Sequence, residues 1–250
     1  MHEVEDGWRS TMNDPRLKGS AAVDDGGADG VEGHDTRHRL DKQVNVGVKR
    51  VQVRVLGPPA ILDVPGVQHV RPQAVEFLVH LIVRGGSAYQ QEILDDLMPE
   101  PPRRLAAQRL HTYTYNLRRI CTLIGGENTY LQLKRHRYTL NHDAFDVDLW
   151  TMRDAITAAQ SATEPAAHVA ALRRAVDFYR GPLADHAGYL WLAPHRDTVT
   201  REFVTAALTL AEALADRPAE ARSALQAAAL HHPDDERLAA ALLATRRRTD

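Results

Sequence analysis

The chain has 250 residues, of which 31 are basic and 33 acidic, so its formal net charge is −2. Its single cysteine, Cys121, excludes an internal disulfide and a multi-thiolate metal site, and such sparing cysteine use is typical of a cytoplasmic protein. No apolar run approaches the roughly 18 residues of a membrane span, and the N-terminus is acidic where a signal peptide needs a basic end. These features predict a cytoplasmic protein with no membrane contact.

The charges are distributed unevenly along the chain. Residues 101–140 contain 8 basic residues and 1 acidic residue, a net charge of +7, whereas the segments on either side are net acidic. A strongly basic segment in an otherwise acidic chain indicates that one face of the protein meets a polyanion.

Residues 1–45 are rich in Gly and Asp and poor in branched and aromatic side chains. Such a composition buries too little apolar surface to offset the entropy of ordering the chain, which predicts a disordered tail.

Residues 46–100 predict three strands and two helices. Alternating apolar residues at 51–56, at 61–64 and at 67–70, separated by Gly-Pro and Pro-Gly turns, favour a small antiparallel meander. Helical spacing begins at Arg71-Pro72 and stops at Gly85-Gly86, and residues 87–98 form a second, shorter helix that Pro99 ends.

A third helix is predicted from Pro101-Pro102 to about Thr122. Its apolar spacing places one set of side chains on a buried stripe, namely Leu110, Thr114, Leu117 and Cys121. The opposite, outward face consists of Gln108, Thr112, Tyr115 and Arg119, with Asn116 at its edge. Two short strands, 129–133 and 138–140, then form a hairpin around the basic tip 134–137.

The remaining residues predict an all-helical region. A helix follows 146–150, and further helices are expected at 167–179, 196–215, 219–231 and 236 to about 245, arranged as helix-turn-helix pairs similar to tetratricopeptide repeats. Trp150 and Trp191 are expected to anchor the core of this region. The last helix carries an apolar face of Leu238, Leu242 and Leu243 with no following helix to cover it, which indicates an interface.

A resemblance to a known family is carried by the segments VQVRVLGPPAIL, RPQAVEFLVHLI, EILDDLMP, LHTYTYNLRRICTLIG and RYTL. They resemble the OmpR/PhoB-type winged helix of the Streptomyces antibiotic regulatory protein family. The segments DVDLW and RGPL, with the later Trp191, are similar to the bacterial transcriptional activator domain that follows it in that family. The resemblance implies an α+β N-terminal winged helix followed by an all-α tetratricopeptide-like domain. The expected parts are a disordered tail at 1–45, the winged helix at 46–142 and the activator domain at 143–250.

The resemblance and the charge pattern together indicate where DNA would bind. Thr112, Asn116 and Arg119 are expected near base edges, since a helix fits the major groove and these side chains can pair there. The full expected DNA-binding set is Arg104, Gln108, Arg109, Thr112, Asn116, Arg118, Arg119, Lys134, Arg135, His136 and Arg137. The glycines that usually precede the wing tyrosine are replaced here by Arg135 and Arg137, which adds charge and removes turn freedom.

The sequence therefore predicts a DNA-binding transcriptional regulator, an activator that binds promoter repeats and contacts RNA polymerase or a second copy of itself. A protein-interaction or signalling module, whose altered wing has lost sequence-specific DNA binding, is the alternative. No phosphate-binding loop, dinucleotide fingerprint, zinc-protease motif or nucleophile elbow occurs in the chain, so no enzyme activity, catalytic residue, metal or cofactor is expected. The expected location is the cytoplasm, associated with the nucleoid.

Overall fold

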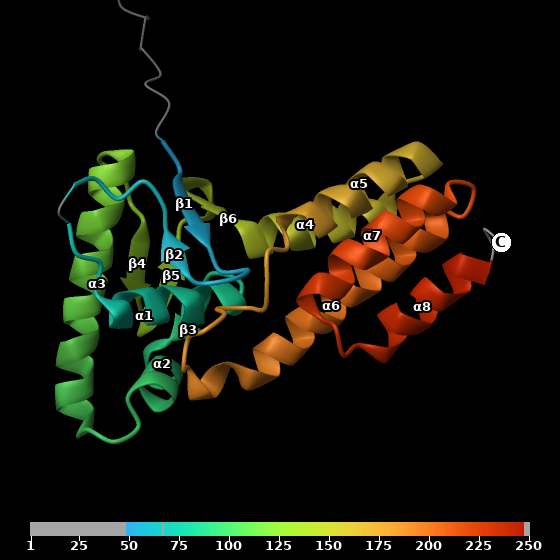
Figure 1. The fold of residues 1–250 in the computed structure, drawn as a ribbon. Coiled ribbons are helices and arrows are strands. Elements are labelled where there is room, and N and C mark those ends of the chain that lie inside the picture. The colour runs from blue at the N-terminus through green and yellow to red at the C-terminus, as the bar shows by residue number, and fades with distance from the viewer. Residues whose placement is uncertain (1–48, 67, 248–250) are drawn as a thin grey trace, which may run out of the picture. The chain divides into compact units, whose positions relative to one another are not determined.

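The computed structural model describes residues 49–66 and 68–247 (Figure 1). The predicted disordered tail, residues 1–45, lies outside the described residues. The described part is mostly helical, with two small sheets placed before and between its helices. None of the helices in the described ranges combines the length and the apolar character that crossing a membrane requires.

The first sheet has the strand order β2-β1-β6. Strand β1 (Val51–Arg54) pairs antiparallel with β2 (Ala60–Ile61) and parallel with β6 (Phe145–Val147), with Val51 opposite Phe145. The predicted third strand of the meander, at 67–70, is wrong: residues 68–70 lie in no strand, and the third place is taken by β6 from much later in the chain. Gln68 and His69 are exposed, so this stretch has too little apolar surface to compete with the buried Phe145 and Val147.

Three helices follow. Helix α1 (Pro72–Val83) confirms the predicted start at proline, which has no N–H to leave unpaired in the first turn. The predicted helix at 87–98 is corrected in its first turn, because β3 (Ser87–Tyr89) joins a sheet and α2 (Gln90–Leu97) begins only after it. Helix α3 (Arg103–Gly125) is the long helix that the sequence predicts, and it extends slightly beyond Thr122.

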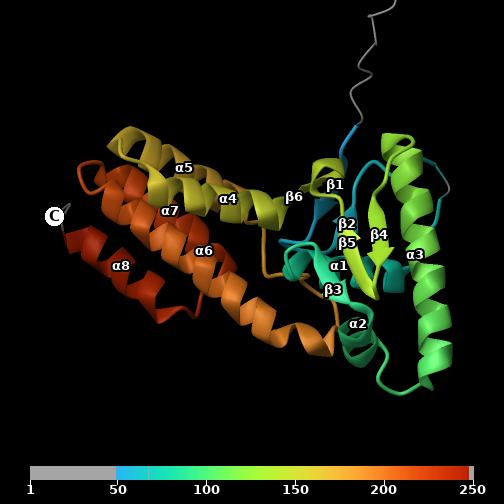
Figure 2. The same ribbon diagram turned by 180° about the vertical axis from the view of Figure 1, so that it is seen from behind.

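The second sheet is antiparallel and has the order β3-β5-β4. Strands β4 (Leu131–Lys134) and β5 (Arg137–Leu140) form the predicted hairpin, which runs beside α3 (Figure 2). The two residues at its tip, Arg135 and His136, have φ angles of 48° and 59°. Both therefore occupy the left-handed region that a two-residue hairpin turn requires and that glycine or asparagine adopts at lower cost.

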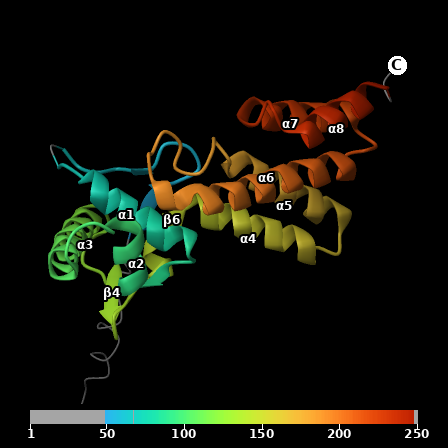
Figure 3. The ribbon, with the colours of Figure 1, turned by 90° about the horizontal axis from the view of Figure 1, so that it is seen from below.

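The C-terminal part is all-α, as predicted. A short 3₁₀ turn, η1 (His142–Ala144), precedes β6, and a second, η2 (Leu190–Leu192), precedes α6. The helices are α4 (Asp148–Ser161), α5 (Pro165–Phe178), α6 (Ala193–Ala213), α7 (Pro218–His231) and α8 (Glu236–Arg247). Each packs on the next in the chain, as the side-by-side pairs α4–α5 and α7–α8 in Figure 3 show.

The last helix is better covered than the sequence predicts. Leu238 is fully buried and Leu242 is half-buried, while Leu243 is 57% exposed. The expected uncovered apolar face is therefore wrong for Leu238 and Leu242, because α8 turns back onto α7 and α6 and buries them there.

The helical region is joined to the first sheet by backbone and carboxylate contacts. The Asp148 carboxylate accepts hydrogen bonds from the backbone N–H groups of Val55 (2.9 Å) and Leu56 (3.0 Å). The N–H of Gly57 donates to the carbonyl of Pro182 at 3.0 Å. Gly181, beside Pro182, has a φ of 155°, a backbone conformation that favours glycine, so glycine suits this turn.

Candidate nucleic-acid interface

Helix α3 has the two faces that its sequence predicts. Leu110, Leu117 and Cys121 are fully buried and Thr114 is nearly so, which confirms the predicted stripe. The hydroxyl of Thr114 donates to the carbonyl of Leu110 at 2.9 Å, so this polar side chain is satisfied inside the core. Burial raises the pKa of the Cys121 thiol to about 12, which leaves it a neutral core residue.

The opposite face of α3 is exposed. Gln108, Thr112, Tyr115 and Arg119 all lie on it, and Tyr115 is 69% exposed. The Thr112 hydroxyl donates to the carbonyl of Gln108 at 3.3 Å, and its methyl group remains available to a partner. This stripe offers an amide, a hydroxyl, a phenol and a guanidinium in a row along one helix.

Cations flank the stripe. Arg104 and Arg109 are exposed on α3, and neither has an ion-pair partner among the described residues. Arg103, by contrast, forms an ion pair with Asp95 of α2. The one acidic residue of the 101–140 segment, Glu127, lies after the end of α3, so the helix surface itself is positive.

Asn116 does not lie where the sequence analysis placed it. Its side chain is only 9% exposed, its Oδ1 accepts from the backbone N–H of Arg71 at 3.1 Å, and its Nδ2 donates to the carbonyl of His69 at 3.5 Å. Helical periodicity put this residue at the edge of the outward face, but the segment before α1 covers that edge. Asn116 therefore binds protein backbone here, and a direct contact of Asn116 with a base stays a prediction.

Arg118 is exposed but already engaged. Its Nε and one terminal nitrogen donate to the carbonyl of Leu131 at 3.2 and 2.8 Å. The guanidinium thus fastens β4 to α3 and fixes the hairpin relative to the helix. A phosphate contact by Arg118 stays a prediction.

The hairpin tip is exposed and basic. The side chains of Lys134 and Arg135 have no ion-pair partner among the described residues. The carbonyl of His136 accepts from the N–H of Gln90 at 2.7 Å, which ties the tip to the start of α2. Arg137 donates to the Ser87 hydroxyl at 2.7 Å and its guanidinium lies 5.3 Å from the centre of the Tyr89 ring, so it is held along the sheet edge.

Gln68 is a polar residue of this surface that the sequence analysis missed. Its Oε1 accepts a hydrogen bond from the guanidinium of Arg119, 51 residues later in the chain. The sequence predicted a strand of the meander at 67–70, and a residue in such a strand is not expected to lie beside α3.

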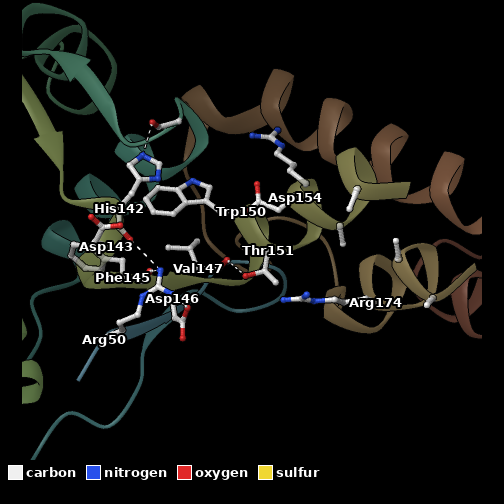
Figure 4. A pocket seen from close by; sticks show the side chains of 16 residues that line it. Arg50, His142, Asp143, Phe145, Asp146, Val147, Trp150, Thr151, Asp154 and Arg174 are labelled. Carbon is white, nitrogen blue, oxygen red and sulfur yellow. Dashed lines mark hydrogen bonds and ion pairs between the residues drawn. The ribbon is translucent and has the colours of Figure 1, made fainter. Parts of the chain in front are cut away.

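A groove of about 860 Å³ is lined by residues of β6, α4 and α5 (Figure 4). Two of its arginines are engaged: Arg50 donates to the carbonyls of His142 and Phe145, and Arg153 pairs with Glu202. The ring of His142 is stacked on that of Trp150, with 4.1 Å between centroids. Within the described ranges no cluster of three or more His, Cys, Asp or Glu side chains suits a metal ion.

Comparison with known structures gives a match to EmbR of Mycobacterium tuberculosis, solved in complex with a low-affinity phosphopeptide. The two share 22% sequence identity and a TM-score of 0.62, over 78% of this chain and 54% of the other. The described fold is thus the fold of part of EmbR, and the chain spans about half of that protein's length. Comparison with curated protein sequences gives no match.

The helical part can be assigned further. Residues 147–250 match the family model of the bacterial transcriptional activator domain. This agrees with the resemblance noted in the sequence for that part of the chain.

Proposed function

We propose that the chain is a sequence-specific DNA-binding transcriptional regulator. In this proposal residues 46–142 form an OmpR/PhoB-type winged helix, with α3 as the recognition helix and the β4–β5 hairpin as the wing. Three helices with a strand after the first and an antiparallel hairpin after the third support this assignment.

The observation that carries the proposal is the surface of α3. An exposed stripe of Gln108, Thr112, Tyr115 and Arg119 shares α3 with the exposed Arg104 and Arg109, and the hairpin that follows α3 has an exposed, basic tip. A helix fits the major groove, where amide and guanidinium groups pair with base edges, while unpaired cations bind phosphates. The solvated face of an ordinary helix would balance these cations with carboxylates, and α3 carries none.

In this proposal the helical part makes the protein contacts through which the chain regulates transcription. Its match to the transcriptional activator family supports a role in activation, through contact with RNA polymerase or with a second copy of the chain bound to an adjacent promoter repeat. Two copies on half-sites one helical turn apart would place both recognition helices on the same face of the duplex.

A mobility-shift titration of the full chain with duplex DNA at several salt concentrations tests the proposal. If five to seven phosphates are neutralised, the slope of log affinity against log salt is about −4 to −6. Replacing Lys134 with Ala should reduce the slope by about 1, whereas the control Arg174→Ala, on α5 of the helical part, should leave it unchanged. A flat slope would refute DNA binding and favour the protein-interaction module.

A further inference from the structure

The outward stripe of α3 is bracketed by protein on both sides. On one side Arg118 bonds to β4 of the hairpin. On the other side residues 68–71, the segment just before α1, lie against the C-terminal half of α3. The helix surface that remains open between the two brackets is the stripe described above.

Asn116 fixes this segment in place. Its one amide side chain binds the N–H of Arg71 and the carbonyl of His69, two backbone groups on either side of Val70. The side chain of Asn116 is nearly buried, and these two part-buried bonds tie the segment to α3. Gln68 directly precedes this anchored segment, and its side chain contacts Arg119 of the stripe.

Gln68 and Arg119 are both exposed, and both carry polar groups that DNA could contact. The carbonyl oxygen of the Gln68 side chain accepts from one terminal nitrogen of Arg119. An arginine has five N–H donors in a planar fork, so a bond to one nitrogen leaves an edge of the fork for a base.

We propose that Gln68 is a positioning residue for base recognition: it fixes the guanidinium of Arg119 so that Arg119 pairs bidentately with a guanine in the major groove. The inference rests on the proposed function and names the specificity-determining pair within it. A free arginine loses much rotamer entropy on binding, and a side chain already held by a hydrogen bond loses less. Asn116 then acts on DNA recognition through segment 68–71, from inside the protein.

Selection of binding sites from random duplexes by the full chain tests the proposal. The compared proteins are the wild type, Arg119→Ala, Gln68→Ala and Gln68→Glu. The matched control is Gln73→Ala, a variant of an exposed glutamine in the first turn of α1 with no hydrogen-bond partner among the described residues. Each protein is also titrated with one non-selected duplex over a range of salt concentrations.

We expect the wild type and Gln73→Ala to select guanine at one position of the site. Arg119→Ala and Gln68→Ala should lose the preference at that same position, by about tenfold or more for a bidentate pair. Gln68→Glu should retain it, because a carboxylate also accepts from the guanidinium. On the non-selected duplex both variants should keep the wild-type salt slope, because the proposal gives neither side chain a phosphate contact.

Three results would overturn the inference. If Gln68→Ala selects the wild-type base while Arg119→Ala does not, Arg119 pairs without help from Gln68. If Arg119→Ala selects the wild-type base, Arg119 does not contact a base. If the wild type itself fails to bind any duplex, the proposed function is wrong and the inference falls with it, a result that the salt titration distinguishes from the first two.

Discussion

The indole Nε1 of Trp191 donates a hydrogen bond of 3.0 Å to Oε1 of Glu76, which lies 115 residues earlier in the chain. The same indole meets the ring of His80 edge-on, with 4.9 Å between centroids. Trp150 also binds α1, since its Nε1 donates to the carbonyl of Ile82 at 3.0 Å. The two tryptophans that were expected to anchor the helical region thus donate hydrogen bonds to groups of α1. Helix α1 in turn packs against α3.

Replacing Glu76 with Gln should stabilise the protein at neutral pH. Burial raises the pKa of Glu76, and the hydrogen bond from Trp191 opposes that rise. Ionisation of Glu76 is therefore less favourable in the folded than in the unfolded protein, so its contribution to stability is full below pH 4.5 and is lost as the pH rises. Glutamine keeps an acceptor for Trp191 without the charge. Thermal unfolding should show a higher midpoint than wild type at pH 7 and no gain at pH 4; a lower midpoint at pH 7 would contradict this.

His80 should make the protein less stable in mild acid. Burial lowers its pKa from 6.5 to about 4, although the hydrogen bond to Asp96 opposes the shift. The neutral ring is thus favoured in the folded state, so its stability contribution is complete above pH 6.5 and is lost as the pH falls toward 4. Urea unfolding between these pH values should show a decline of about 1.4 kcal/mol per pH unit from this residue.

The variant His80→Gln should remove this part of the pH dependence, because glutamine can still donate to Asp96 but does not titrate. His111→Gln, at an exposed position on α3, is the control and should keep the wild-type slope. Equal slopes for wild type and His80→Gln would show that the dependence has another source.

Asp148 and Asp146 should respond very differently to replacement by Asn. The half-buried Asp148 carboxylate binds the N–H groups of Val55, Leu56 and Leu149, and an amide oxygen cannot accept all three as well. Asp148→Asn should therefore lower the free energy of unfolding by about 1–3 kcal/mol. Asp146 forms an exposed ion pair with Arg50, so Asp146→Asn should cost less than about 1 kcal/mol. Chemical denaturation of both variants checks this, and similar losses would argue against a joining role for Asp148.

Arg135→Gly should stabilise the fold while weakening DNA binding. Glycine relieves the left-handed backbone at this position, a gain of about 1 kcal/mol, and removes one cation of the hairpin tip. Arg135→Ala removes the same cation without relieving the backbone. Both variants should reduce the salt slope by about 1, and only the glycine variant should raise the melting temperature. A slope unchanged in both would exclude Arg135 from the DNA contact.

Leu238→Ala should destabilise the helical part by about 2–5 kcal/mol, since the side chain is fully buried. Leu243→Ala, at an exposed position of the same helix, should change stability by less than about 0.5 kcal/mol. Thermal or urea unfolding of the two variants measures this difference in stability and shows whether Leu238 is a core residue or part of an interface. If Leu238→Ala is as stable as wild type but dissociates an oligomer, the covered position of Leu238 is refuted.

The sequence by itself determined the elements whose signal is local. The helical spacing around Leu110, Thr114, Leu117 and Cys121 fixed both faces of α3, and proline and glycine marked the ends of α1. The basic hairpin and the helices of the C-terminal part followed from equally local patterns. In each case the periodicity of a single segment decides which side chains face the core.

Only the tertiary structure decided what lies next to these elements. The third strand of the first sheet is β6 rather than residues 67–70, and Asn116 is buried by a segment about 45 residues earlier in the chain. Trp150 and Trp191 reach across to α1, and Leu238 is covered by the helices before it. Periodicity describes one element at a time, whereas partner choice depends on the free energy of burial summed over distant segments. For that reason the pairing of Gln68 with Arg119 could be found only in the folded chain.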